Sequence, residues 1–231
     1  MASSRPVARG RLPLVPLLLI ALAAAACAGR TPRLVPPSGE VSAVEGFGSA
    51  SISGSEAAIK GKFGFVFRAP EQGRVEAFDP IGRTVFLIVF RDGRAWFVLP
   101  GRKVYSEDAA AVMMERFLGV ALLPGEALRL LSGTWTAEVP PGDTGGWRVE
   151  RNASGRVVRG VRDGFAFSVK TFFPGDAVPK EIGLEGPAAS GRVKVLKLNF
   201  NPAPREGTFD TAFIRAYAPK TWDEILDLLD R

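Results

Sequence analysis

The sequence has 231 residues, of which 30 are Lys or Arg and 24 are Asp or Glu, so its formal net charge at pH 7 is +6. It contains no histidine and one cysteine. The missing histidine excludes Ser-His and Cys-His nucleophiles and removes the commonest metal ligand, while one thiol excludes an intramolecular disulfide. We therefore expect a binding protein without enzymatic activity and without a bound metal.

Residues 1–26 are typical of a secretory signal peptide. Arg5, Arg9 and Arg11 form a basic start, and an apolar run over residues 12–26 follows. About fifteen apolar residues are too few to span a bilayer, which favours a signal over a membrane helix. Removing residues 1–26 leaves 205 residues, and because Lys plus Arg falls to 27 while Asp plus Glu stays at 24, the net charge becomes +3. This charge is too small to predict nucleic-acid binding.

Cys27 directly follows four alanines and would be the first residue after cleavage. The segment resembles the lipobox of bacterial lipoproteins, although Ala24 stands where a Leu is usual. That resemblance implies a diacylglycerol and an N-acyl chain on Cys27, and two or three chains are enough for stable anchoring. Because no Asp follows the cysteine, it also implies sorting to the periplasmic face of the outer membrane. The alternative is an ordinary secretory signal beside a chance cysteine.

Residues 27–45 are polar and rich in proline, which predicts a tether. The next elements are expected to be strands. Residues 58–68 alternate, with Ile59, Phe63, Phe65 and Phe67 on one face. Further β-type segments follow at residues 75–78, 84–90, 95–99 and 104–105.

The period then changes to that of a helix. Ser106 is the expected N-cap of a first helix that ends near Gly119, with an apolar stripe formed by Ala109, Met113 and Phe117. A second helix is expected from Pro124 to the C-terminal stop Gly133.

Strands resume after the helices, at residues 148–151, 156–161, 165–173, 180–184 and 193–200. Turn signals at residues 152–155 and 163–164 indicate antiparallel hairpins. Thr221 caps an amphipathic helix that turns Trp222, Ile225, Leu226 and Leu229 inward. Strands, two helices and further strands predict a mainly β fold with a helical cap (α+β): a half-open antiparallel β-barrel covered by short helices, over residues 46–204, followed by an extension over 205–231.

The middle of the chain resembles a known family, the outer-membrane lipoprotein receptor LolB and its relatives. The matching residues are Asp79-Pro80-Ile81-Gly82 before an apolar strand, then Tyr105, Asp108, Leu118-Gly119, Pro124, Leu128 and Gly133. The resemblance covers residues 45–135 and implies a LolA/LolB-like barrel with an apolar interior. It implies a monomer that takes acylated lipoprotein cargo from a periplasmic lipoprotein carrier and inserts it into the outer membrane. Residues 205–231 have no counterpart in that family.

Two groups of site residues follow. In the family, an exposed apolar residue on the loop that matches Pro80, Ile81 and Gly82 is important for membrane delivery. A β-branched residue at a turn tip either points outward as a wedge or plugs the barrel mouth. The candidates for an acyl-chain cavity are Phe63, Phe65, Phe67, Phe165, Phe167 and Phe173. The alternative is that these side chains fill an ordinary core.

Two other functions stay open. The chain could be a lipid-anchored binding module for another amphiphile, or an envelope assembly factor on the same fold, since one fold serves unrelated functions. A carboxylate-based glycan hydrolase is disfavoured, because no pair of acidic residues stands out from the pattern.

Overall fold

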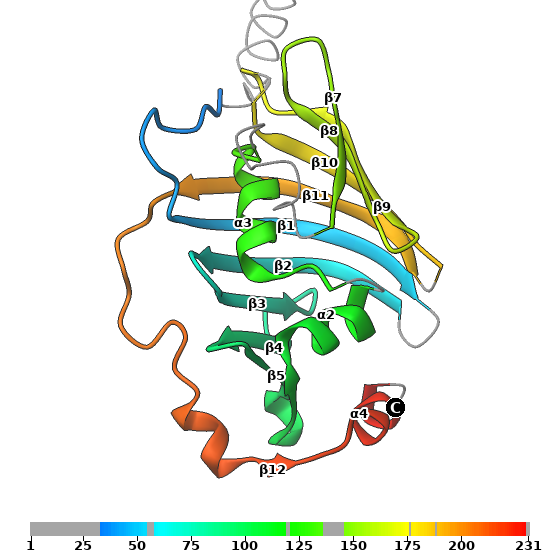
Figure 1. The fold of residues 1–231 in the computed structure, drawn as a ribbon. Coiled ribbons are helices and arrows are strands. Elements are labelled where there is room, and N and C mark those ends of the chain that lie inside the picture. Colours follow the sequence, from blue (N-terminus) through cyan, green and yellow to red (C-terminus); the bar gives the residue numbers. More distant parts are fainter. Residues whose placement is uncertain are drawn as a thin grey trace, which may run out of the picture. The chain divides into compact units, whose positions relative to one another are not determined.

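A single twelve-stranded sheet is the framework of the part of the chain that the computed structural model describes, namely residues 33–54, 58–118, 121–135, 146–175, 177–187 and 189–229 (Figure 1). Cys27 and the predicted signal peptide, residues 1–26, lie outside these residues. None of the described helices is long and apolar enough to cross a membrane.

The sheet combines two antiparallel meanders. The first consists of β1 (Ala43–Gly54), β2 (Ala58–Arg68), β3 (Gln72–Phe78), β4 (Thr84–Arg91), β5 (Arg94–Leu99) and β6 (Val104–Ala109). The second consists of β7 (Arg148–Arg151), β8 (Val157–Arg162), β9 (Phe165–Phe172), β10 (Pro179–Glu185) and β11 (Ala189–Phe200). The antiparallel pair β1–β11 joins them, so strands that are about 150 residues apart in the sequence lie at the centre of the sheet.

β1 begins within the segment that the sequence suggested was tether. Val44 is fully buried, and the chain before it is held by the side chain of Asn201 at the end of β11. Asn201 Oδ1 accepts hydrogen bonds from the backbone N–H groups of Ser42 (2.9 Å) and Ala43 (3.2 Å), and its Nδ2 donates to the carbonyl of Glu40 (2.9 Å). The polar side chain of Asn201 therefore fixes where the sheet begins.

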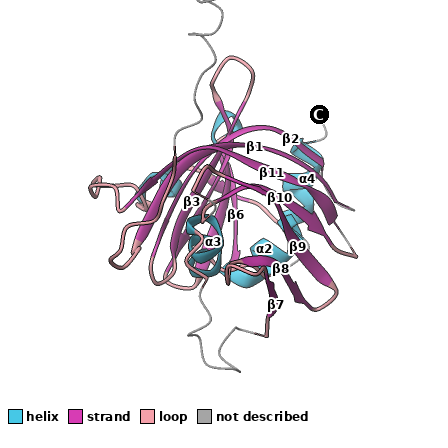
Figure 2. Ribbon diagram, turned by 90° about the horizontal axis from the view of Figure 1, so that it is seen from above, coloured by secondary structure: helices cyan, strands magenta, loops and turns pink. Residues whose placement is uncertain are grey.

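Two helices, α2 (Ala110–Leu118) and α3 (Pro124–Ser132), pack on the concave side of the curved sheet (Figure 2). The prediction of α3 is confirmed, including its stop at Gly133, which has a φ of +71°. A Cβ on Gly133 would lie 2.0 Å from the carbonyl oxygen of Ala177, so only glycine fits.

The predicted start of the first helix at Ser106 is wrong. β6 continues to Ala109, because Glu107 pairs with Trp96 across the strands and binds the Arg94 guanidinium (2.6 Å). Ser106 is buried within β6, and the helix starts at Ala110. Cross-strand pairing therefore outweighs the local preference of an acidic pair for a helix start.

The C-terminal segment wraps around the sheet. Its 3-10 helix, η2 (Ala212–Ala216), lies on the convex side of β4 and β5. There Ile214 covers Leu87, Val89 and Val98, which explains why β4 is apolar on both faces. β12 (Ala218–Pro219) then pairs in parallel with β6 at the sheet edge. Another 3-10 helix, η1 (Pro100–Arg102), belongs to the first meander and joins β5 to β6.

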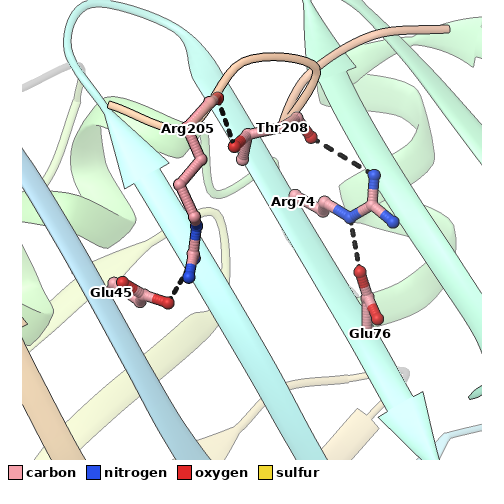
Figure 3. A network of polar contacts seen from close by, with 5 residues as sticks. All are labelled: Glu45, Arg74, Glu76, Arg205 and Thr208. Carbon is pink, nitrogen blue, oxygen red and sulfur yellow. Dashed lines mark hydrogen bonds and ion pairs between the residues drawn. The ribbon is translucent and has the colours of Figure 1, made fainter. Parts of the chain in front are cut away.

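Polar contacts hold the start of this segment to the convex face (Figure 3). Arg205 forms an ion pair with Glu45 of β1. Arg74 of β3 binds Glu76 (2.5 Å) and donates from Nη1 to the carbonyl of Thr208 (3.2 Å). The extension is thus bound to β1 and β3 before it reaches β6 near the edge of the sheet.

α4 (Trp222–Leu229) brings the chain back to the concave side. Its predicted cap is confirmed, since Thr221 Oγ1 accepts from the N–H of Glu224 (3.3 Å) and Glu224 accepts from the N–H of Thr221 (2.9 Å). Trp222 packs edge-on against Phe97 of β5, with 5.3 Å between ring centroids, and Ile225 is fully buried. α4, the last element of the C-terminal extension, is therefore a structural part of the barrel interior.

Candidate functional site

An apolar cavity of about 390 Å³ lies between the concave face of the sheet and the helices. Its wall includes Phe63 of β2, Phe86 of β4, Met114 of α2, Leu130 of α3 and Trp222 of α4. Lys60 and Lys62 are the charged residues among the described lining residues, and both lie on the strand at one end of the cavity. Strands of the sheet together with α2, α3 and α4 therefore enclose a space that is apolar and suited to a hydrocarbon chain.

Two of the six candidate phenylalanines, Phe63 and Phe67, line this cavity. Phe65 lies between them on β2, with ring centroids 5.7 Å and 5.9 Å away, but is not part of the cavity wall. The strand alternation inferred from the sequence therefore places all three on the concave face, while the cavity uses only the outer two.

The other three candidates pack under α3 and in the second meander. Phe167 lies 5.4 Å from Trp135 and 5.3 Å from Trp147, and Phe165 lies 6.2 Å from Trp147. Phe173 is buried beside Lys180. Phe165 and Phe167 thus belong to an aromatic cluster with Trp135 and Trp147, and none of the three phenylalanines is among the described residues that line the cavity.

Two glycines of β1, the strand beside β2, explain why space remains inside the barrel. A Cβ on Gly46 would lie 2.3 Å from Cζ of Phe65, and one on Gly48 would lie 2.9 Å from Cζ of Phe63. Both phenyl rings therefore lie flat across β1 and do not extend into the interior. Gly46 and Gly48 were missed in the sequence, although their two-residue spacing matches that of the phenylalanines opposite them.

The cavity opens at one end of the strands, where β3 ends and β4 begins. Two of its lining residues, Val85 of β4 and Leu229 of α4, are 45% and 36% exposed. Ala58, at the start of β2, is also an exposed lining residue. The mouth is thus formed by apolar side chains from three elements.

Ile81 lies on the turn that joins β3 to β4, at the same end of the strands as the mouth, and its side chain is 76% exposed. Asp79 Oδ1 accepts hydrogen bonds from the N–H groups of Ile81 (3.0 Å) and Arg83 (2.9 Å), and its Oδ2 binds Nε of Arg83 (2.7 Å). The hydrogen bond from the Arg83 side chain is the main reason that the pKa of Asp79 is below its ordinary value. Gly82 closes the turn with a φ of +86°. Ile81 does not line the cavity, so it projects outward and does not plug the mouth.

A buried polar cluster fixes α3 to the far end of the sheet. Glu126 of α3 binds Arg162 of β8 (2.7 Å) and accepts a hydrogen bond from the indole N–H of Trp147 (3.0 Å). Arg162 also donates to the carbonyl of Ala121 and lies 4.4 Å above the ring of Trp147. These contacts place the helix that forms one wall of the cavity.

No cluster of three or more His, Cys, Asp or Glu side chains that could hold a metal occurs among the described residues. Neither a family model nor a curated protein matches the sequence.

Solved structures match the fold. A domain described as an outer-membrane lipoprotein-sorting protein from Vibrio parahaemolyticus is 10% identical, with a TM-score of 0.51 over 76% of this chain and 92% of that chain. A LolA superfamily protein from Nitrosomonas europaea is 10% identical, with a TM-score of 0.46 over 76% and 93% of the two chains. A DUF1329 family protein from Desulfovibrio piger has a TM-score of 0.49 at 10% identity, over 75% and 92%. The likeness to the Vibrio parahaemolyticus domain supports the fold that the sequence predicted, a mainly β, half-open antiparallel sheet covered by short helices.

Proposed function

From this fold and its cavity, we propose that the protein accepts acyl chains of lipoproteins from a periplasmic carrier and inserts them into the outer membrane, to which Cys27 anchors it. The observation that carries the proposal is the apolar cavity, whose mouth lies at the same end of the strands as the exposed Ile81. A chain that leaves the mouth would meet an apolar residue suited to contact with a bilayer. The resemblance of the sequence to LolB supports the same function.

The size of the cavity supports a single acyl chain. A methylene group occupies about the volume of a water molecule, roughly 30 Å³, so 390 Å³ holds about thirteen methylenes. Burying that many methylenes is worth on the order of 10 kcal/mol. Such a site is close to lipid in its affinity for a chain, which suits transfer in either direction.

A transfer assay tests the proposal. The chain with Cys27→Ala, so that no anchor contributes, is mixed with a fluorescent acylated lipoprotein held by its periplasmic carrier, and liposomes are added. We expect cargo to leave the carrier and then to reach the liposomes. With Ile81→Glu we expect uptake from the carrier to persist and delivery to fall by at least tenfold. Leu196→Glu is the matched control, because Leu196 is an exposed apolar residue on the outer face of β11.

Failure of uptake from every carrier tested would overturn the receptor function. The second candidate, a module that binds another amphiphile, would then be favoured by the same cavity, because its apolar wall does not distinguish the chain of a lipoprotein from that of another lipid.

A further inference from the structure

The barrel wall has a notch beside the mouth. β2 starts at Ala58 but pairs with β3 only as far as Lys62, which lies opposite Phe78. Beyond this pair the chain leaves β3 through the turn that carries Ile81. The apolar cavity and a second pocket of about 1000 Å³ meet at this notch, since five residues belong to the walls of both: Ala50, Lys60, Gly61, Lys62 and Phe78.

The second pocket lies on the convex face and is basic. Ser49 of β1 pairs with Lys62 of β2 on one side and with Lys194 of β11 on the other. Residues paired in this way share a face, so the three side chains form one row on the sheet. Two residues along, Ser51 forms a second row with Lys60 and Arg192. β1, β2 and β11 lie side by side in Figure 1.

The acidic residues of this pocket do not balance its cations. Within the described residues, the carboxylates in its wall are those of Glu181 and Asp79. Glu181 lies 3.4 Å from Arg192, and Asp79 is bound to Arg83. The three exposed lysines around the two serines therefore give the pocket a positive potential, which attracts anions.

We infer that the notch binds a single lipid with an anionic headgroup, with its acyl chain in the cavity and its phosphate among Lys60, Lys62 and Lys194. The inference rests on the proposed acyl cavity and names a ligand class for it. Lysine ammonium groups and serine hydroxyls are donors that suit phosphate oxygens. The acylated cysteine of a lipoprotein carries amide, ester and thioether groups, none of which is ionised. The basic pocket therefore matches a glycerophospholipid better than it matches a lipoprotein anchor.

Two ligands with the same chain separate the headgroup from the cavity. Myristoyl lysophosphatidylglycerol carries a phosphate, and monomyristoyl glycerol does not. Both are titrated, as monomers, against the chain with Cys27→Ala, alone and with Lys62→Gln/Lys194→Gln. We expect the wild-type residues to bind the anionic ligand at least tenfold more tightly, because hydrogen bonds between charged groups contribute about that factor. The double substitution should lower this ratio about tenfold, as should 0.5 M salt.

The control is Arg148→Gln/Arg215→Gln, which removes the same charge from two exposed residues outside the pocket and should leave the ratio unchanged. A ratio near one, or equal loss in the control, would overturn the inference while leaving the acyl cavity in place. Equal binding of glycerol phosphate would show a site for free phosphate. Binding to phosphatidylglycerol vesicles without binding of the lysolipid would show a membrane-docking surface. Both of these results overturn the single-lipid site. Binding of neither myristoyl ligand would contradict the acyl cavity itself.

Discussion

Arg162 of β8 and Glu126 of α3 form an ion pair of 2.7 Å whose side chains are only 11% and 7% exposed. The pair joins two parts of the chain that are 36 residues apart and connects the helical cap to the second meander. Because Glu126 also binds Trp147 and the N–H of Leu123 (2.9 Å), its carboxylate is almost fully satisfied.

Removing this carboxylate should strongly destabilise the protein. With Glu126→Ala, the buried guanidinium of Arg162 loses the carboxylate of Glu126, so we expect the free energy of unfolding in urea to fall by about 3–5 kcal/mol. Glu150→Ala is the matched control, since it breaks an exposed pair of 2.9 Å with Arg159 and should cost below about 1 kcal/mol. Equal losses in the two variants would show that the buried pair does not hold α3.

Adding one methyl group to β1 should disturb the inner wall. Gly46→Ala places a Cβ against Phe65 and 2.6 Å from the carbonyl oxygen of Lys197. We expect thermal unfolding to report a loss of about 1–3 kcal/mol, the usual cost of overpacking. Gly101→Ala is the control, because a Cβ there meets no atom within 4 Å. A neutral Gly46→Ala would mean that the Phe65 ring need not lie across β1.

Trimming α4 should lengthen the cavity. Trp222→Ala removes the ring that packs on Phe97 and forms part of the wall. We expect the fatty acid that binds best to shift from about fourteen carbons to a longer chain, measured by displacement of a fluorescent fatty acid. Phe213→Ala, which removes a ring on the convex side that packs edge-on against Tyr217, should leave the preferred length unchanged. An unchanged length with Trp222→Ala would exclude α4 from the binding wall.

The turn that presents Ile81 should withstand mild acid. The pKa of Asp79 is lowered, chiefly by the Arg83 side chain, so its ionised form contributes stability above the unfolded value of about 3.9, and this contribution is lost as pH falls through the folded pKa. NMR titration of the Asp79 carboxyl should give a midpoint below 3.9, and Arg83→Gln should raise it. Arg91→Gln, which breaks the separate pair with Asp92, should not move the midpoint.

Local patterns in the sequence predicted much of this fold. The turn at Asp163-Gly164 has two positive φ values, 49° and 79°, as the tight hairpin inferred from that dipeptide requires. The stop at Gly133 and the cap at Thr221 depend equally on neighbouring residues, and both are confirmed. Features that depend on near neighbours in the chain can be read without knowing the rest of the fold.

Features that depend on distant partners could not be read in this way. The start of β1 at Ala43 depends on Asn201, and the two-residue β12 exists only because β6 lies beside it. The candidate cavity shows the same division. Alternation placed the phenylalanines of β2 on the correct face, but which of them border a void depends on glycines of the neighbouring strand and on Trp222 of the C-terminal helix.

The pairing of β1 has a consequence for where the start of the described chain lies. The N–H of Leu34 binds the carbonyl of Pro174 (3.1 Å), close to the end of β1 that is remote from the Ile81 turn. β1 alone separates its two ends by about 36 Å. The start of the described chain and the exposed Ile81 therefore lie at opposite ends of the barrel wall.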